Sequence, residues 1–472
     1  MIQLHELQFI IPLITICVAS VLVLIVEVFS RNREVVFAVT TLSVFVALII
    51  TIRDISYSTI ILNNFININN VSSGFNIVVL LSVLLSLLES RSYLIKKQIN
   101  FGEYYAIILF SLIGMMLMVM ANDLLIVFLG LEMMSICFYI LAGFMRKRIK
   151  SNESALKYFL LGAFMTGFLL YGITLIYGVS GTTNLMVLFS NTLLHQEPLF
   201  LIGVGLFLIG FLFKIGAFPF HMWVPDVYDG APTIVSGFMS TAGKIAAVAT
   251  IFPIILKLNI LDYRIIISVV SVLTMMFGNI IALAQTNIKR LLAYSSIASA
   301  GYLLVGLAAF NDMALRGILF YTLAYSFMQL GAFIVVGIIE KSSSDNKDFS
   351  NISLDSYKGL AKRNPVLATI FTLFLFSLAG IPPFAGFWGK YYLFVAAIKA
   401  NLIWLSIVAI LLSVIGIYYY LKVIVYMWFT DPETDETYIM SPLGTTAIIL
   451  SIAGTIFFGL FPEIFFELIR FY

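Results

Sequence analysis

Charged side chains are scarce in this sequence of 472 residues: Asp, Glu, Lys and Arg make up only 11% of it. A soluble domain has about 25% charged residues, whereas 61% of this chain is hydrophobic. The composition therefore indicates an integral membrane protein. The formal net charge of +3 is too small to suggest a nucleic-acid partner.

Cysteine is almost absent, and this excludes several kinds of redox site. The two cysteines, Cys17 and Cys137, both fall inside apolar runs, so they are too few and too buried for a disulfide framework. The sequence contains no Cys-x-x-Cys, no Cys/His cluster and no Gly-x-Gly-x-x-Gly. We therefore expect no iron–sulfur, zinc or dinucleotide site, and no cofactor, in this chain.

Long apolar runs dominate what is present. A bilayer core of about 30 Å needs roughly 20 apolar residues per helix. The runs are continuously apolar rather than alternating, which argues against membrane-spanning strands. The sequence predicts an all-α polytopic membrane protein with about 14 transmembrane helices in a single membrane domain. The runs are approximately 8–29, 35–52, 74–94, 103–121, 123–145, 153–179, 198–223, 232–257, 264–285, 289–309, 312–339, 365–397, 401–429 and 443–468.

The charges of the loops predict how these helices are oriented. Alternating crossings that begin outside place the basic segment 146–150 and the Lys-containing linker 340–364 on the inner side, as the positive-inside rule requires. Two loops on that side, 224–231 and 430–442, are acidic, but the rule applies to the sum over loops. We therefore expect both termini on the outer side, which is the periplasm of a Gram-negative cell.

Among the charged side chains of the apolar runs, five stand out because of where they lie: Glu132, Lys157, Lys214, Lys244 and Lys390. A lysine near the middle of a spanning helix costs about 2.5–3.5 kcal/mol on an insertion scale. Charges inside a membrane usually pair with one another or line a route for ions or protons. We therefore predict a pathway for protons or ions through the helix bundle. The alternative is that these charges are structural ion pairs that only hold helices together.

Other polar residues allow two interpretations each. Lys157 follows a basic loop, so its amine could instead snorkel to the membrane interface. His221 lies beside Pro219 at an expected helix end; imidazole titrates near neutral pH, which suits a proton relay, but the side chain could equally be a polar cap. Lys289 and Arg290 begin a helix and are expected to bind phospholipid headgroups or to set topology. Most of the many aromatic side chains are interpreted as lipid contacts or interfacial belts.

Two segments that are far apart in the chain resemble each other. Residues 216–223 read Gly-Ala-Phe-Pro-Phe-His-Met-Trp, and residues 380–388 read Gly-Ile-Pro-Pro-Phe-Ala-Gly-Phe-Trp. Proline removes a backbone donor and clashes with the preceding turn, so we expect broken helices near Pro219 and near Pro382-Pro383. Paired, interrupted helices in two halves of a chain point to transport sites near the membrane midplane. One lysine of the apolar runs lies close to each expected break.

Several stretches of the chain resemble a known family. They are residues 122–135, 155–163, 218–233, 289–297 and 380–390. These motifs resemble those of the antiporter-like membrane subunits of NADH-quinone oxidoreductase (respiratory complex I), and within that family the chain looks most like the subunit N type. The resemblance extends over nearly the whole chain and is clearest over roughly 100–430.

The resemblance implies a particular organisation of the fold. It implies about fourteen helices with two inverted five-helix repeats, each containing one of the broken helices. An N-terminal three-helix segment, 1–100, would precede the repeats 101–260 and 261–430, and residues 431–472 would form the last helix, all within the single membrane domain 1–472.

The same resemblance implies roles for the buried charges. Glu132 would be the ion-pair glutamate, and Lys214 would be its lysine partner. Lys244 would be the central proton-carrying lysine, and Lys390 the terminal lysine toward the outer exit. Lys157 and His221 match secondary positions in the same row of charges, which we call the axis.

The function implied by the resemblance is proton translocation coupled to NADH:quinone electron transfer in other subunits. FMN, iron–sulfur clusters and quinone would then be held by partner subunits. The partners would be M-type and K-type membrane neighbours, the hydrophilic arm and phospholipids, in the inner (plasma) membrane of a bacterial cell. A subunit of an Mrp-type sodium/proton antiporter, which shares the proline and lysine motifs, and a purely structural scaffold are the alternatives.

Overall fold

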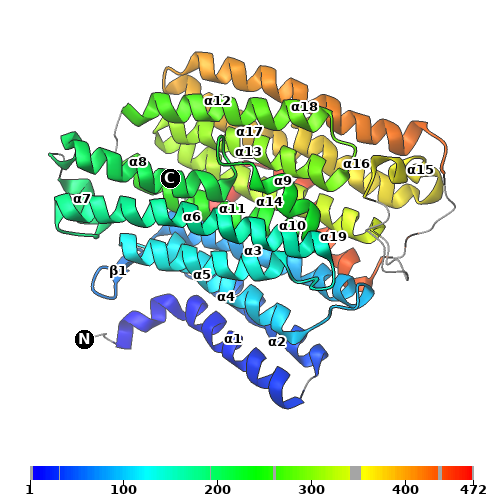
Figure 1. Ribbon diagram of the computed structural model, residues 1–472, viewed down its shortest axis with the longest axis horizontal. Helices are drawn as coiled ribbons and strands as arrows, with labels where there is room; N and C mark the ends of the chain where they lie inside the picture. Colours follow the sequence, from blue (N-terminus) through cyan, green and yellow to red (C-terminus); the bar gives the residue numbers. More distant parts are fainter. Residues whose placement is uncertain are drawn as a thin grey trace.

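The computed structural model describes residues 4–30, 32–191, 193–258, 262–340, 352–433, 438 and 440–469, and it is almost entirely helical (Figure 1). In this part of the chain, thirteen helices are long and apolar enough to cross a membrane, and one shorter apolar helix, α16, accompanies them. The predicted all-α polytopic membrane fold is confirmed. The elements are η1 (Leu4–Ile10), α1 (Ile11–Ser30), α2 (Arg33–Arg53), β1 (Thr59–Ile61), β2 (Ile66–Ile68), α3 (Asn70–Lys96), α4 (Gly102–Val119), α5 (Leu124–Ala142), α6 (Ile149–Ser180), α7 (Leu185–Ser190), η2 (Leu194–Gln196), α8 (Pro198–Ile215), α9 (Trp223–Gly230), α10 (Thr233–Phe238), η3 (Met239–Gly243), α11 (Lys244–Leu258), α12 (Asp262–Leu283), α13 (Ile288–Ala309), α14 (Asp312–Ile339), η4 (Leu354–Tyr357), α15 (Leu360–Arg363), α16 (Pro365–Ala379), α17 (Ala385–Lys399), α18 (Ile403–Phe429), α19 (Pro442–Leu460) and α20 (Glu463–Leu468).

The helices differ in how far their neighbours cover them. The apolar stretch of α14 is 100% buried, that of α13 is 94% buried, and that of the segment formed by α10, η3 and α11 is 89% buried. The stretches of α1, α2, α6, α12, α18 and α19 are less than half buried. Figure 1 shows α1 and α2 along one flank of the bundle and α18 along the opposite flank. The centre of the molecule is therefore built from α11, α13 and α14.

Hydrogen bonds between loops show which loops share an end of the bundle. At one end, Asn67 N–H donates to Met120 C=O at 2.8 Å, and Leu124 N–H donates to Thr183 C=O at 3.0 Å. We call this end, with loops 54–69, 120–123 and 181–184, the hairpin end. At the other end, Ile288 N–H donates to Ile352 C=O at 2.9 Å. We call that end, with loops 97–101, 143–148, 284–287 and 352–364, the basic end.

The linker 53–73 contains a structure that the apolar pattern did not predict. Its strands β1 and β2 form an antiparallel hairpin in which Thr59 pairs with Ile68. Asn63 and Asn64 stand in the turn with φ of 54° and 68°, a conformation that asparagine tolerates better than most residues. The argument against strands therefore holds for the membrane spans and not for this short linker.

Both predicted helix breaks are present, and they have the same construction. α8 ends at Gly216, which has φ of 74°, and α16 ends at Gly380, which has φ of 84°. Glycine is favoured at such a left-handed helix end because it has no Cβ. A cis X-Pro peptide bond follows each glycine, at Phe218-Pro219 and at Pro382-Pro383. The weak sequence repeat thus corresponds to a repeated structural feature.

A third irregularity interrupts one of the central helices. The π-helical turn η3 (Met239–Gly243) joins α10 to α11 directly before Lys244. Single π-helical turns inside α-helices are frequent at functional sites. A methyl group on Gly243 would come within 2.3 Å of the Phe138 ring, so the turn packs closely against α5.

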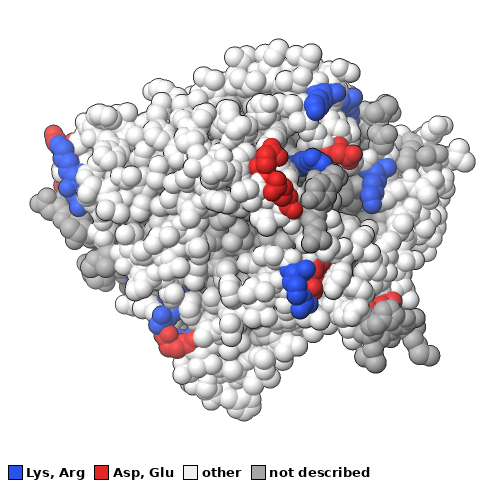
Figure 2. All heavy atoms as spheres, turned by 180° about the vertical axis from the view of Figure 1, so that it is seen from behind, with Lys and Arg blue, Asp and Glu red and all other residues white. Residues whose placement is uncertain are grey.

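The surface agrees with a membrane location. Figure 2 shows one face on which Lys, Arg, Asp and Glu side chains gather in a few small groups, while most of the face carries no charge. The exposed faces of peripheral helices carry large apolar side chains, such as Phe164 at 62% exposure and Leu411 at 61% exposure. A continuous uncharged surface of this kind suits contact with lipid.

Candidate functional site

Three lysines of the apolar runs lie inside the bundle. Lys214 is 6% exposed, Lys244 is 3% exposed and Lys390 is 7% exposed. They come from α8, α11 and α17 respectively. Because protein surrounds all three amines, none of them faces lipid, and each must find its polar partners within the bundle.

Lys214 lies in an aromatic pocket against α5 and α6. Its Nζ atom donates a hydrogen bond to the Tyr139 hydroxyl at 3.2 Å. The same amine lies 5.1 Å from the centre of the Tyr139 ring, 5.5 Å from that of Tyr158 and 5.4 Å from that of Phe213. Ring faces attract a cation electrostatically, so this pocket can hold a charged lysine with few hydrogen bonds.

Glu132 lies near this pocket but does not touch the amine. It is close enough to act electrostatically on both Lys214 and the Tyr139 hydroxyl. However, the described residues contain no Glu132–Lys214 ion pair within 4.0 Å, and Glu132 Oε1 is buried without a hydrogen-bond partner. The structure therefore places the expected pair in one neighbourhood, with Tyr139 contacting the lysine.

Lys244 is held by one serine of the neighbouring helix. Its Nζ atom donates to both the carbonyl oxygen and the hydroxyl oxygen of Ser296 on α13. The amine also lies 5.5 Å from the centre of the Tyr325 ring on α14. Lys244, on α11, thus lies against both α13 and α14, the two most buried of the described helices.

Lys390 contacts the second helix break. Its Nζ atom donates to the Ala379 carbonyl at 2.9 Å and to the Ser413 hydroxyl at 3.0 Å. The amine also lies 4.9 Å from the centre of the Tyr302 ring. The Ala379 carbonyl belongs to the last turn of α16, whose C-terminal carbonyls have no helical donor. The lysine therefore satisfies a backbone group that the break leaves free.

Polar side chains line most of the way from Lys244 to Lys390, and we call them the tyrosine–serine file. Among the described contacts, none joins the side chains of the neighbouring Ser296 and Ser295, which point in different directions on α13. Beside Ser296, the Ser295 hydroxyl lies 2.5 Å from the Tyr420 hydroxyl, and the Tyr420 ring lies 4.4 Å from the Tyr419 ring. The Tyr419 hydroxyl donates to Asn279 Oδ1 at 3.2 Å, and Asn279 Nδ2 lies 3.4 Å from the Tyr302 hydroxyl. The file consists of Ser295, Ser296, Tyr420, Tyr419, Asn279 and Tyr302.

The link from Lys214 to Lys244 is sparser. Tyr228 lies within reach of Ser296, the partner of Lys244, and acts electrostatically on Tyr158 of the Lys214 pocket, but no hydrogen bond among the described contacts joins Tyr228 to that pocket. Beside Lys244, the Phe138 ring packs 5.3 Å from the Phe238 ring and against Gly243. The line of buried charges is therefore in two pieces, one around Lys214 and the other from Lys244 to Lys390.

Lys157 and His221 lie apart from these two pieces. The Lys157 amine pairs with Glu153 at 2.7 Å and with Asp226 at 2.9 Å, and 44% of its side chain is exposed. His221 is 4% exposed and packs against the rings of Phe218 and Phe277, while its Nδ1 atom has no hydrogen-bond partner in the described structure. None of these contacts reaches a buried lysine of the axis.

Asp226 lies in α9, outside the membrane-spanning segments, and holds two cations. It accepts from Lys157 at 2.9 Å and from Arg290 at 2.8 Å. Burial raises the pKa of the Asp226 carboxyl, but the hydrogen bonds from Lys157 and Arg290 outweigh burial and hold the pKa below its usual value. The cluster therefore remains ionised at neutral pH.

One interpretation of the sequence is wrong, and another has exceptions. Lys289 does not face lipid headgroups: it is fully buried, and its amine donates to the carbonyls of Asp229 at 3.0 Å and Ala231 at 2.7 Å. The tyrosines are not all lipid contacts, because Tyr302, Tyr419 and Tyr420 are at most 3% exposed. Hydrophobicity alone does not distinguish a lipid-facing tyrosine from a buried one, because lipid tails and the protein core are both apolar.

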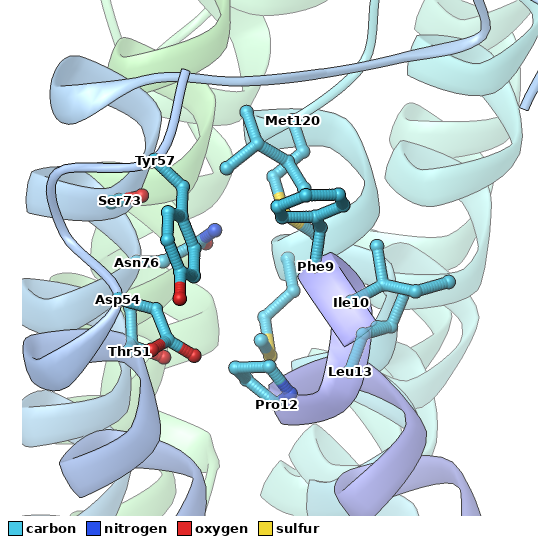
Figure 3. Close-up of a pocket in the computed structure, with 12 residues that line it drawn as sticks. Phe9, Ile10, Pro12, Leu13, Thr51, Asp54, Tyr57, Ser73, Asn76 and Met120 are labelled. Atoms are coloured by element: carbon cyan, nitrogen blue, oxygen red, sulfur yellow. The ribbon is translucent and has the colours of Figure 1, made fainter. Parts of the chain in front are cut away.

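Two cavities lie near the hairpin end, away from Lys214, Lys244 and Lys390. The larger, about 170 Å³, is lined by residues that include Asn122, Thr250 and Lys257. The smaller, about 20 Å³, has Tyr57 and Asp54 on one side and Phe9 and Ile10 on the other (Figure 3). Neither set of lining residues includes a lysine of the axis.

The chain is similar to known membrane proteins along most of its length. Residues 121–416 match the family described as "NADH:quinone oxidoreductase/Mrp antiporter, TM". The chain is 48% identical to NADH-quinone oxidoreductase subunit N of Trichlorobacter lovleyi, over 84% of this chain and 82% of the relative. It is 35% identical to F(420)H(2) dehydrogenase subunit N of Methanosarcina mazei, over 98% of each chain.

Solved structures agree with these relatives. A chain of respiratory complex I from Thermus thermophilus superposes with a TM-score of 0.83 at 31% identity, over 96% of this chain and 98% of that one. A chain of the Mrp complex from Dietzia superposes with a TM-score of 0.85 at 21% identity, over 98% and 96% of the two chains, which shows a shared fold. Together with the broken helices and the buried lysines, these similarities show that the chain belongs to the subunit N family of NADH-quinone oxidoreductase, the antiporter-like membrane subunits of respiratory complex I.

Proposed function

We propose that this protein is a proton-translocating membrane subunit of NADH-quinone oxidoreductase. The observation that carries the proposal is the row of buried amines, of which Lys244 and Lys390 have the tyrosine–serine file between them. Lysines buried in a membrane protein are costly, and hydroxyl and amide groups between them can pass a proton along hydrogen bonds.

The working cycle begins at the Lys214 pocket. Electrons from NADH reach quinone through other subunits, which hold FMN, the iron–sulfur clusters and the quinone. The released free energy arrives as a conformational or electrostatic signal along the membrane arm. This signal brings Glu132 and Lys214 together or separates them, and the change in local charge drives a proton from Lys244 toward Lys390.

Topology and partners follow from the same family. We place the basic end on the cytoplasmic side of a bacterial inner membrane and both termini in the periplasm, since the segments 31–33, 91–97, 146–150, 289–290 and 341–363, which this topology puts on that side, contain 16 of the 27 lysines and arginines. Lys390 then leads toward the periplasmic exit. M-type and K-type membrane subunits, the hydrophilic arm and phospholipids are the proposed partners.

Substitution of the central lysine tests the proposal. Lys244→Ala in the assembled complex should lower NADH-driven proton pumping by about tenfold or more, the scale of a lost proton-transfer group. Lys422→Ala, near the end of α18, is the matched control and should change pumping little. Equal pumping in both variants, at equal assembly, would contradict the proposal.

Copurification separates this function from that of an Mrp-type sodium/proton antiporter subunit. Flavin and iron–sulfur absorbance should accompany the chain when it is isolated from its native membrane. Sodium-dependent proton exchange by an isolated complex that lacks those chromophores would favour the antiporter instead. Unchanged pumping after joint neutralisation of Glu132, Lys214 and Lys244 would favour a structural scaffold.

A further inference from the structure

A fully buried carboxylate at the basic end takes no part in the pathway described so far. Glu340 directly follows α14, and its side chain has no exposed surface. The Thr233 hydroxyl donates to Glu340 Oε2, and the Tyr93 hydroxyl donates to the same oxygen at 3.1 Å. These contacts join α14 to α3 and to the first residue of α10, the helix that leads to Lys244.

The two oxygens of Glu340 face different surroundings. Lys97 Nζ lies 3.3 Å from Oε1, and 9% of the Lys97 side chain is exposed. This contact is an ion pair without hydrogen-bond geometry, because Oε1 has no hydrogen-bond partner in the described structure. Oε1 therefore faces the amine of a side chain that keeps a small exposed surface, whereas Oε2 faces the two hydroxyl groups inside the bundle.

Charged and titratable groups act on this site from every neighbouring element. Lys289 on α13 interacts electrostatically with Glu340, but its amine is already engaged by the Asp229 and Ala231 carbonyls. The remaining groups are Tyr93 and Lys97 at the end of α3, Tyr357 on η4, and Arg148 before α6. Arg148 acts electrostatically on Lys97 and on Lys289. Among the described groups, Lys97 is therefore the amine that links Glu340 to the surface.

Hydroxyl groups continue from Glu340 toward Lys244, and we call Thr233, Ser236 and Ser240 the hydroxyl ladder. All three are 0% exposed and lie on α10 and η3. Residues three and four apart share one side of a helix, so these hydroxyls form one row. Lys244 follows Ser240 by four residues, and its side chain tilts back toward the N-terminal end of the helix. In the described structure Ser236 donates to the Tyr228 carbonyl and Ser240 to the Gly237 carbonyl. The row therefore marks a way from the buried carboxylate to the central amine along which each hydroxyl must turn to pass a proton on.

We propose that Glu340 takes up protons at the basic end and that the hydroxyl ladder conducts them to Lys244. The proposal rests on the proposed function of Lys244. In the first step the Lys97 ammonium gives a proton to Glu340 Oε1, and Lys97 is reprotonated from solution. Rotation of the carboxyl group turns this proton toward the Thr233 hydroxyl, which accepts it and releases its own proton to the next hydroxyl. No covalent bond other than those to the moving protons changes.

Substitution of the carboxylate tests the uptake step. Glu340→Gln keeps the shape of the side chain and an oxygen that accepts from Thr233, but it cannot carry the proton. In the assembled complex we expect NADH-driven pumping to fall by about tenfold or more, while Glu340→Asp recovers part of the loss. Assembly is followed by the flavin that copurifies with the chain. A normal pumping rate in Glu340→Gln would overturn the proposal.

A second variant tests conduction without touching the carboxylate. Ser240→Ala leaves the contacts of Glu340 intact and should lower pumping several-fold. Ser111→Ala is the matched control, because Ser111 and Ser240 are both 0% exposed and both donate to the carbonyl three residues earlier. Equal pumping by Ser240→Ala and Ser111→Ala would overturn conduction along the ladder, and this comparison decides the matter if Glu340→Gln does not assemble.

Failure of this inference can be distinguished from failure of the proposed function. If Lys244→Ala abolishes pumping while Glu340→Gln and Ser240→Ala pump normally, protons reach Lys244 by another route and only the uptake site is wrong. If Lys244→Ala pumps normally, the proposed function itself is wrong. A loss in Glu340→Gln that Glu340→Asp partly reverses, with assembly unchanged, supports uptake over a purely structural contact.

Discussion

Lys214 and Lys390 each lie beside a broken helix of the same construction, yet their surroundings differ. Lys214 is surrounded by rings and contacts one hydroxyl, that of Tyr139. Lys390 contacts a free carbonyl and a serine hydroxyl, and the tyrosine–serine file leads away from it. The break thus fixes where a lysine stands, while the side chains around it decide whether a polar route continues.

The difference assigns different tasks to the two pieces of the axis. On the route from Lys244 to Lys390, hydroxyl and amide groups follow one another closely from Ser295 to Tyr302, so a proton can follow it once the step between the side chains of Ser296 and Ser295 is bridged. The step from Lys214 to Lys244 has Tyr228 within reach of Ser296 on the Lys244 side but no hydrogen bond from Tyr228 to the Lys214 pocket among the described contacts, and the rings of Phe138 and Phe238 that pack beside Lys244 offer none. We infer that the first piece controls the timing of transfer and that the second piece conducts.

The largest expected effect comes from replacing Asn279, the one amide of the tyrosine–serine file. Asn279 contacts the hydroxyls of Tyr419 and Tyr302, so Asn279→Leu removes one polar partner from each of two buried hydroxyls. We expect a stability loss of about 1–3 kcal/mol and proton pumping reduced by about tenfold or more. Proton uptake by proteoliposomes during NADH oxidation measures the effect.

A buried amide outside the file is the control for this substitution. Asn76 is 2% exposed, and it lines the small cavity near the hairpin end (Figure 3). Asn76→Leu should leave pumping unchanged. If both variants lose pumping equally, the file has no special role and the two pieces of the axis do not differ as described.

Alanine substitutions of the two glycines at which α8 and α16 end, Gly216 and Gly380, compare the two helix breaks directly. A methyl group on Gly380 would come within 3.0 Å of Lys390 Cδ, whereas one on Gly216 would come within 2.7 Å of the Val224 side chain. Both substitutions to alanine cost roughly 1–2 kcal/mol, because both glycines have positive φ. We expect Gly380→Ala to lower pumping more than Gly216→Ala at equal loss of thermal stability. The reverse order would show that the break near Lys214 is the more sensitive one.

The Lys214 pocket should respond more weakly to loss of a hydroxyl. Tyr139→Phe removes the acceptor of the Lys214 hydrogen bond but keeps the ring beside the amine. A typical hydrogen bond contributes about 0.5–1.5 kcal/mol, so pumping should fall by a factor of about 2–10. Tyr420→Phe, which cuts the contact with Ser295, is the comparison. Loss of pumping in Tyr139→Phe that exceeds the loss in Tyr420→Phe would contradict the assignment of conduction to the second piece.

The sequence predicted the membrane fold, both helix breaks and the burial of the three lysines, because each has a local signal. Apolar runs indicate spans, Gly/Pro clusters indicate breaks, and a lysine in an apolar run is costly wherever it lies. The hydroxyl groups give no such signal. Tyr419, Tyr420 and Ser295 occur in apolar helices whether they face lipid or the core, and only the packing of α12, α13 and α18 brings them together.

Glu340 shows a second limit of the sequence. It stands at the border between an apolar run and a charged linker, where a glutamate normally lies in water. Its burial depends on the ends of α3, α10 and α13, which are more than 50 residues away in the sequence. An isolated amide such as Asn279 was the one detectable signal of the file, since it interrupts the apolar run 264–285.

The smallest expected effect concerns Asp226 and its partner Lys157. The pKa of Asp226 is held below its usual value, so its contribution to stability is complete above the usual carboxyl range and is lost only as the pH falls through the lowered pKa. Between pH 5 and pH 8, wild type and Asp226→Asn should therefore differ by a constant amount. That amount should be about 1 kcal/mol or less, because the contacts are partly exposed.

Thermal unfolding of the purified complex at pH 5 and at pH 8 measures this difference in stability, and proton pumping should change little. A tenfold loss of pumping in Asp226→Asn would instead place Lys157 on the proton route and extend the first piece of the axis toward the basic end.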